Sequence, residues 1–328
     1  MTDTAIQEYT APVQSDLELF DNKLTDYLRG DSPLISSIAR HLLKSRGKRI
    51  RPAMLFLSSR ASDNFTDHTV DASLAIELIH TATLLHDDVV DESDLRRGQQ
   101  TVNAAWTNLI SVLMGDYLFA KAFRVMVDAN SMELVQAISR ATERVSVGEL
   151  RQIEEIGNYA LSEDEYLDII ANKTASLFSV SCETGPILMR KFGNERRRFA
   201  EFGEKVGTAF QIADDLLDFV GDPQLTGKEP GNDVLTGKVT LPLIYSLGKV
   251  SQQSTKEIID RIKGDGYDPQ ESFEFVYKFI NENGGLEYAY RRANEICQQG
   301  LDSISPLQPS VYYDSLTDMV RFTVARAS

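Results

Sequence analysis

Two groups of aspartate residues in this chain share the spacing Asp-Asp-x-x-Asp. The members of the first cluster and then of the second are Asp87, Asp88 and Asp91, and Asp214, Asp215 and Asp218. Each cluster follows a long apolar segment of helical periodicity, so its first and last members lie on one face, a turn apart. Aspartate is a poor helix-interior residue, and like charges four residues apart repel each other. A solvated acidic face would explain one such cluster. Two clusters that each destabilise a helix indicate a cationic ligand that offsets the repulsion.

Hard cations with oxygen ligands fit this pattern. Mg²⁺ takes one or two carboxylates together with waters and substrate phosphates, rather than an all-protein cage. Two facing clusters would then hold several Mg²⁺ ions against one diphosphate. Such an anion also needs basic side chains. Arg96 and Arg97 follow the first cluster directly, and Arg matches phosphate oxygens in pairs. Further candidates are Lys173, Lys228 and Lys238, although each one alone would be an ordinary surface lysine.

The elements that must position these residues are helices. Apolar residues recur every three to four positions in segments 71–85, 114–127, 131–153 and 199–219, and no useful length of strand-like alternation occurs. Asp71 and Ser162 are expected N-caps, the latter with Glu165 in a capping box. No repeat or linker divides the chain, so we expect one all-α domain spanning residues 1–328. The polar segment 223–233 is expected to be a loop that could cover a site.

Composition excludes several classes of protein. The 328 residues are 42% hydrophobic, so the chain can bury a large core. Its net charge is -15, so nucleic acid is not an expected partner. No apolar run reaches the ~20 residues of a membrane span, and the N-terminus lacks the pattern of a signal peptide. Cys182 and Cys297 are expected to be buried free thiols. A cytoplasmic location is the default expectation.

Taken together, these features resemble a known family. The chain is similar to the trans-isoprenyl diphosphate synthases, and among them to the long-chain polyprenyl diphosphate synthases of the octaprenyl type. The matching residues, from about residue 47 to about residue 240, are Gly47-Lys48-Arg49-Ile50-Arg51-Pro52, His80, the first aspartate cluster with Arg96-Arg97-Gly98, Gly115-Asp116, Lys173-Thr174, Gln211 with the second cluster, and Gly237-Lys238. The resemblance implies a large helical bundle around a deep central cavity, usually a homodimer.

The resemblance also implies roles for individual residues. Those that would bind the diphosphate of isopentenyl diphosphate are Lys48, Arg51, His80 and Arg97. Those that would bind the allylic diphosphate are Arg96, Lys173, Lys228 and Lys238. The six clustered aspartates would hold Mg²⁺. Lys173, Thr174 and Gln211 would form the catalytic group, with Thr174 and Gln211 lining the site where positive charge develops. The simpler interpretation of His80, a core histidine with satisfied hydrogen bonds, stays open.

The implied reaction is a head-to-tail condensation. Loss of diphosphate from the allylic substrate leaves an allylic cation, and Mg²⁺ with the basic residues stabilises the departing charge. The double bond of isopentenyl diphosphate, held in its own basic pocket, then attacks the cation. The released diphosphate removes the last proton, so no side chain is named as the base.

The length of the product should depend on the helix that enters the first cluster. Thr83 lies one turn, ~5.4 Å, below Asp87, and Ala82 lies beside it. Short-chain members of the family carry bulky aromatic residues here, so these small side chains predict a product of about C30 to C45. The candidates for the floor of the tunnel are Phe123, Met126 and Ile138, for each of which plain core packing is an equally good interpretation.

Three alternatives remain. A terpene cyclase would replace the second aspartate cluster and lack the pocket formed by Lys48, Arg51 and Arg97. A non-catalytic partner subunit should have lost one cluster. The remaining alternative is a shorter-chain synthase making farnesyl or geranylgeranyl diphosphate. A synthase would make at most peripheral contact with a membrane, for product release.

Overall fold

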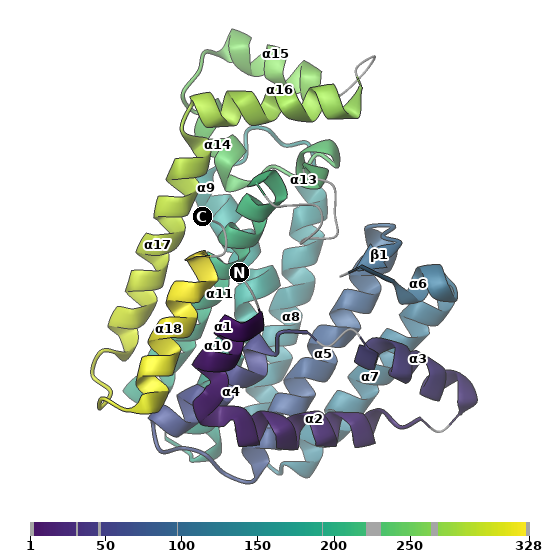
Figure 1. The fold of residues 1–328 in the computed structure, drawn as a ribbon, viewed down its shortest axis with the longest axis vertical. Helices are drawn as coiled ribbons and strands as arrows, with labels where there is room; N and C mark the ends of the chain where they lie inside the picture. Colours follow the sequence, from purple (N-terminus) through teal and green to yellow (C-terminus); the bar gives the residue numbers. More distant parts are fainter. Residues whose placement is uncertain are drawn as a thin grey trace. The chain divides into compact units, whose positions relative to one another are not determined.

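The computed structural model describes residues 3–30, 32–44, 47–96, 98–191, 193–220, 231–263 and 268–325. These residues are overwhelmingly helical (Figure 1). Within them, β structure is limited to a hairpin of two short antiparallel strands, β1 (Leu95–Arg96) and β2 (Gln99–Gln100). The predicted all-α fold is therefore confirmed.

The chain forms two compact units, each assembled from separate stretches of sequence. The first unit contains Met1–Thr142, Leu177–Gly203 and Ser303–Met319, and the second contains Glu143–Ser176, Glu204–Asp302 and Val320–Ser328. The single domain and the deep central cavity expected from the sequence stay predictions.

The first unit contains the N-terminal helices. In chain order these are α1 (Asp3–Thr10), the 3₁₀ turn η1 (Ala11–Val13), α2 (Gln14–Leu28), α3 (Pro33–Lys44), α4 (Ile50–Ala61), α5 (His68–Val90), α6 (Val102–Ala105), α7 (Asn108–Asp128) and most of α10 (Ser176–Leu188). Long helices α8 (Met132–Glu154), α11 (Asn194–Val220) and α18 (Val311–Ala325) contribute residues to both units.

Helix α5 is the central element of the first unit. Its side chains from Ala72 to Ile79 are almost all apolar and buried, and Leu74 and Leu78 are at most 1% exposed. Such an all-round apolar surface belongs to a helix packed on several sides. Helices α2, α4 and α7 pack against it. The helix ends at Val90 because the polar residues that follow, beginning with Asp91, turn away, and Glu92 has a positive φ of 50°.

The second unit contains the remaining elements. These are α9 (Glu163–Ile170), the π-helical turn η2 (Ala171–Ala175), α13 (Asn232–Leu235), α14 (Leu241–Leu247), α15 (Gln252–Lys263), α16 (Pro269–Glu282) and nearly all of α17 (Gly285–Ile304). The expected loop 223–233 lies outside the described residues as far as residue 230, and its last residues lead into α13.

Two expected helix caps have different outcomes. The capping box at Ser162 is confirmed, since its Oγ accepts from the N–H of Glu165 and the Glu165 carboxylate accepts from the N–H of Ser162. The N-cap expected at Asp71 is wrong, because α5 begins one turn earlier, after Asp67. Asp71 instead lies in the first helical turn and forms an ion pair with Lys23 of α2.

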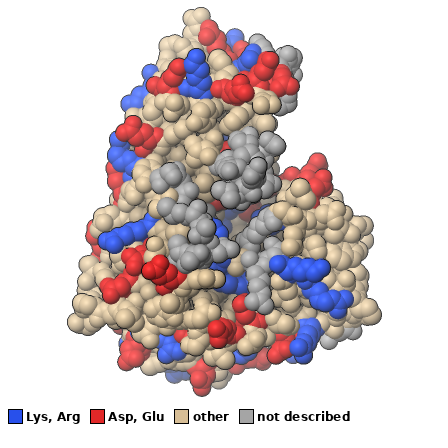
Figure 2. Space-filling model, in the orientation of Figure 1, with Lys and Arg blue, Asp and Glu red and all other residues tan. Residues whose placement is uncertain are grey.

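Both cysteines are free and buried, as expected. Burial raises the pKa of the Cys182 thiol and of the Cys297 thiol to about 12 in each case. No helix in the described ranges is both long enough and apolar enough to cross a membrane. On the face drawn in Figure 2, Lys and Arg side chains are interspersed with Asp and Glu, and most of the described surface carries neither.

Candidate active site

The first aspartate cluster lies at the C-terminal end of α5. Asp87 and Asp88 belong to its last turn, and Asp91 directly follows it, with its N–H still bonded to the Asp87 carbonyl at 2.7 Å. The three side chains differ in environment, since Asp87 is half-buried, Asp88 is 4% exposed and Asp91 is exposed. The structure has these carboxylates at the end of an apolar helix, as the sequence predicted.

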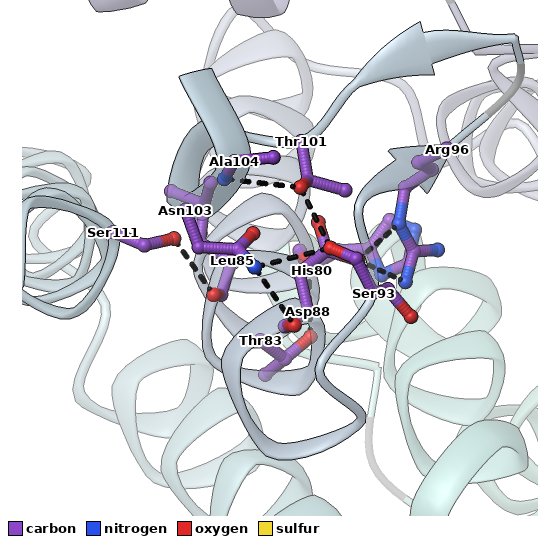
Figure 3. A network of polar contacts seen from close by, with 10 residues as sticks. All are labelled: His80, Thr83, Leu85, Asp88, Ser93, Arg96, Thr101, Asn103, Ala104 and Ser111. Carbon is purple, nitrogen blue, oxygen red and sulfur yellow. Dashed lines mark hydrogen bonds and ion pairs between the residues drawn. The ribbon is translucent and has the colours of Figure 1, made fainter. Parts of the chain in front are cut away.

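The chain after the first cluster folds back onto it (Figure 3). Nε and Nη2 of Arg96, in β1, both lie 2.8 Å from Oδ1 of Asp88. The Asn103 amide donates to the carbonyls of Asp88 and Ser93, and the Thr101 hydroxyl donates to the Ser93 carbonyl at 2.7 Å. These bonds hold the hairpin that carries Arg96 against the end of α5. Sequence reasoning missed Asn103 and Thr101, because single polar residues in a loop carry no distinctive pattern.

His86, next to Asp87, links the C-terminal end of α5 to α7. Its Nε2 lies 3.1 Å from the carbonyl oxygen of Val112 and 3.7 Å from the carboxylate of Asp116. A Cβ atom at Gly115 would lie 2.2 Å from that nitrogen. The Gly115-Asp116 pair found in the sequence therefore has a physical role here, since only glycine leaves room for the imidazole.

The basic side chains at the start of α4 have different partners. Nη1 of Arg51 lies 3.0 Å from Nε2 of His80, and its guanidinium lies over the ring of Phe178 at 4.6 Å. Because an arginine can only donate, this imidazole nitrogen accepts, and the neutral ring carries its proton on Nδ1. Arg49 has a positive φ of 50° and donates to Asp21 and Glu77. The structure thus brings the predicted pair Arg51 and His80 together, whereas Arg49 is neutralised by carboxylates.

The second aspartate cluster lies near the C-terminal end of α11. Asp214 is exposed, whereas Asp215 is 6% exposed and accepts from the Tyr166 hydroxyl at 2.6 Å and from Nε2 of Gln211 at 2.7 Å. Burial, followed by repulsion from Asp233, raises the pKa of Asp215 to about 8, against the opposing effect of these two hydrogen bonds.

The third aspartate of this cluster, Asp218, accepts hydrogen bonds from the backbone at the start of α13. Oδ2 of Asp218 accepts from the N–H of Asp233 at 3.0 Å, and its carbonyl accepts from the N–H of Gly231 at 2.8 Å. The Lys238 ammonium lies 3.9 Å from the Asp233 carboxylate. A small cavity lined by Asp215, Lys238 and Thr240 adjoins this group. The predicted residues Asp215 and Lys238 are therefore neighbours.

The predicted catalytic residues Lys173 and Thr174 lie on the π turn η2. The Lys173 ammonium donates to Glu149 and to Gln152, each at 2.7 Å. The Thr174 hydroxyl donates to Oε1 of Gln211 at 2.7 Å. A hydrogen-bonded chain therefore runs from Thr174 through Gln211 to the second aspartate cluster. Nothing in the spacing of the sequence indicated Glu149 or Gln152 as partners of Lys173.

The acidic residues suit Mg²⁺ in kind. Among the residues that the structure describes, no three Asp, Glu, His or Cys side chains converge closely enough to hold a metal ion by themselves. Mg²⁺ usually completes its coordination with waters and substrate phosphates, so one or two carboxylates per ion are enough. The donor set fits the ion.

Two predicted substrate-binding residues, Arg97 and Lys228, lie outside the described residues. Lys48 is exposed just before α4. Of the residues predicted to affect product length, Thr83 is half-buried and its hydroxyl donates to the His80 carbonyl at 2.8 Å (Figure 3). The side chains of Ala82, Met126 and Ile138 are at most 1% exposed, so no water-sized space adjoins them, whereas Phe123 is 52% exposed.

Comparisons with known proteins agree on one family. The model of the polyprenyl synthetase family matches residues 32–280. The chain is 36% identical over 321 residues to the all-trans-nonaprenyl-diphosphate synthase (geranyl-diphosphate specific) of Rhodobacter capsulatus, covering 98% of both proteins. It is 34% identical over 322 residues to the octaprenyl diphosphate synthase of Escherichia coli (strain K12), again covering 98% of both.

A solved structure is similar along the whole chain. The polyprenyl synthase from Caulobacter crescentus CB15, crystallised with calcium and isoprenyl diphosphate, matches with a TM-score of 0.92 and 32% identity, over 100% of this chain and 98% of that one. A decaprenyl diphosphate synthase from Rhodobacter capsulatus matches with a TM-score of 0.91 and 31% identity, over 98% and 99% of the two chains.

Proposed function

Because this chain belongs to the polyprenyl synthetase family, we propose that it lengthens an allylic diphosphate by repeated head-to-tail addition of isopentenyl diphosphate, to an all-trans product of about C30 to C45. Membership of the family makes the chain a prenyltransferase, as the sequence predicted. The similar proteins named for nonaprenyl and octaprenyl products support a long chain over a farnesyl or geranylgeranyl product.

The observation that carries the proposal is the matching environment of the two aspartate clusters. In each cluster the middle aspartate is buried and held by a specific donor, Asp88 by Arg96 and Asp215 by Tyr166 and Gln211. The flanking aspartates are more exposed. A purely structural acidic surface has no need to bury one carboxyl group of each trio and fix it in this way, since burying a polar group is unfavourable unless it is hydrogen-bonded.

The clusters would bind Mg²⁺ through Asp87, Asp88, Asp91, Asp214, Asp215 and Asp218. The bound ions would act as Lewis acids toward the diphosphate leaving group. The related Caulobacter structure, which contains calcium with isoprenyl diphosphate, supports a divalent cation in this role. Asp88 and Asp215 already have protein donors, so we assign direct contact with the ions first to the more exposed members of each trio.

Two groups of basic residues would bind the two substrates. Isopentenyl diphosphate would be bound by Lys48, Arg51, His80 and Arg97, and the contact between Arg51 and His80 supports this grouping. The allylic diphosphate would be bound by Arg96, Lys173, Lys228 and Lys238. Of these, Arg96 lies beside Asp88 and Lys238 lies beside Asp233.

Thr174 and Gln211 would stabilise the allylic cation. Oxygen atoms with available lone pairs lower the energy of a positive charge that develops nearby. The Thr174 hydroxyl uses its hydrogen on Oε1 of Gln211, which leaves its oxygen as an acceptor-type dipole. The Gln211 amide is in turn fixed by Asp215. The two groups are therefore held in place before substrate arrives.

A homodimer also belongs to the proposal. Exposed apolar side chains follow one face of α7, where Leu109 is 69%, Leu113 57% and Val127 69% exposed. Their spacing of multiples of about 3.6 residues makes a stripe that a second copy could cover. The cytoplasmic location stays a prediction of the sequence.

The test is to incubate the purified chain with Mg²⁺, farnesyl diphosphate and labelled isopentenyl diphosphate, and to resolve the dephosphorylated products. A ladder ending at C30 or longer is the expected result. Growth that stops at C20 or before would contradict the long product but retain the chemistry. No incorporation by folded protein would favour a partner subunit that needs a second chain, and cyclic hydrocarbons would favour a terpene cyclase.

A further inference from the structure

The turn that carries Lys173 and Thr174 is not an ordinary helical turn. Residues Ala171–Ala175 form a π turn, η2, between α9 and α10. Such turns are rare, interrupt the regular hydrogen-bond ladder and tend to occur at functional sites. A turn of this kind needs support from outside its own helix, and its neighbour α8 supplies that support.

Helix α8 approaches η2 closely at Gly148. A Cβ atom at Gly148 would lie 2.3 Å from the backbone nitrogen and 2.7 Å from the Cα of Lys173. Any larger residue at position 148 would push the π turn away. Glu149, the next residue, and Gln152, one turn on, each accept from the Lys173 ammonium at 2.7 Å. The same face of α8 therefore contacts both the backbone and the side chain of Lys173.

Arg144, one turn before Gly148 on α8, links three elements through a single guanidinium. Its Nε donates to Oδ1 of Asn172 at 2.9 Å, and its Nη2 donates to the carbonyl of Ala171 at 3.3 Å. Its Nη1 donates to the Glu204 carboxylate of α11 at 2.8 Å. Two of these acceptors belong to the π turn, and the third belongs to the helix that carries Gln211 and Asp215.

A planar fork with fixed donor directions can define such a geometry, whereas a flexible ammonium cannot. We propose that Arg144 is a positioning residue that holds the π turn in register with α11, so that Thr174 keeps its place beside Gln211 and Lys173 keeps its place beside Glu149 and Gln152. The inference rests on the proposed function in one respect, namely that Lys173 and Thr174 act on the allylic substrate.

The experiment compares steady-state kinetics of the full chain carrying Arg144→Met, Arg144→Lys, Lys173→Ala or Arg151→Met. Arg151→Met is the matched control, because Arg151 lies on α8 with similar exposure, 33% against 36% for Arg144, and pairs with Asp168 of α9 rather than with η2. Values of kcat and of KM for each substrate are measured separately, together with the far-ultraviolet circular dichroism and Tm of every variant.

Both Arg144 variants are expected to lower kcat/KM for the allylic diphosphate by about 10- to 100-fold, since a displacement of about 1 Å at a reacting site has effects of this size. The KM for isopentenyl diphosphate should stay unchanged, as should both substrates' constants in Arg151→Met. The KM for the allylic diphosphate should rise, whereas a general loss of stability would reduce the active fraction and leave both KM values as they are in the parent chain.

Full activity of Arg144→Lys would overturn the proposal, because charge alone would then suffice. The proposal would also be overturned if Arg144→Met had the kinetics of the parent chain while Lys173→Ala had a reduced kcat/KM for the allylic diphosphate. Parent-like kinetics of Lys173→Ala would refute the role of Lys173 itself, and an inactive parent chain would refute the proposed function. If Arg144→Met does not fold, Asn172→Ala removes the acceptor of Nε and should shift the allylic constants in the same direction. An unchanged Asn172→Ala would count against the proposal.

Discussion

Nε and Nη2 of Arg96 both lie 2.8 Å from one oxygen of Asp88, a carboxylate that is only 4% exposed. Arg96→Ala would leave this buried charge without its main partner. We expect the free energy of unfolding to fall by about 1–3 kcal/mol, the usual effect of an unsatisfied buried group. Urea unfolding measures the change. Arg96→Lys, which still supplies a cation, should recover most of it, and equal stability of all three chains would contradict the assignment.

Neutralising the more exposed aspartates should impair the reaction without unfolding the chain. Asp87→Asn and Asp214→Asn remove a charge that would contact Mg²⁺, so we expect kcat to fall at least about 100-fold, as happens when one preorganised stabilising group is lost. The Mg²⁺ concentration for half-maximal rate should rise in both. Asp128→Asn, at the exposed C-terminal end of α7, is the control and should behave as the parent chain does.

Gly115→Ala should disturb the first cluster through His86. The added Cβ would lie 2.2 Å from Nε2 of His86, so the imidazole must leave its place near the Val112 carbonyl. Overpacking of this kind destabilises by about 1–3 kcal/mol. The control is Gly248→Ala, whose Cβ would meet nothing closer than 3.4 Å. Thermal unfolding of both variants checks the prediction, and an unshifted Tm for Gly115→Ala would show that His86 moves freely.

A bulky residue at Thr83 should shorten the product. Thr83 is half-buried and lies one turn before Asp87 on α5, so Thr83→Phe would place a ring below the first cluster. Product length is measured by chromatography after dephosphorylation. Thr81→Phe, at a half-buried position about 200° around the same helix, is the matched control and should keep the parent product length. An unchanged product from Thr83→Phe would mean that the growing chain does not pass this position.

The two cysteines should resist modification in the folded protein. Burial raises the pKa of each thiol to about 12, so at pH 8 the reactive thiolate is scarce as well as inaccessible. A chromogenic disulfide reagent should therefore react slowly with the native chain and rapidly with both thiols in denaturant. Fast reaction of either thiol under native conditions would indicate that its helix opens.

What the sequence by itself determined was the class of fold, the family and the types of residue at the site. Apolar periodicity predicted the segments that became α5, α7, α8 and α11, because a helix that buries one face must repeat apolar residues at its own period. The capping box at Ser162 could also be predicted from the sequence, since both of its partners lie within one turn. The motifs predicted a family that the comparisons confirm.

Only the tertiary structure decided which polar groups meet. The pairs Arg144 with Asn172 and Tyr166 with Asp215 join residues distant in sequence, and no local pattern specifies such contacts. The π turn at Lys173 was equally unforeseen, because an inserted helical residue depends on what packs against it rather than on propensity. The start of α5 at His68 rather than after Asp71 reflects the same limit, since an aspartate can cap a helix or pair with a lysine, and the position of Lys23 selects the ion pair. Spacing along the chain constrains local geometry, whereas the partner of a buried charge is chosen by packing.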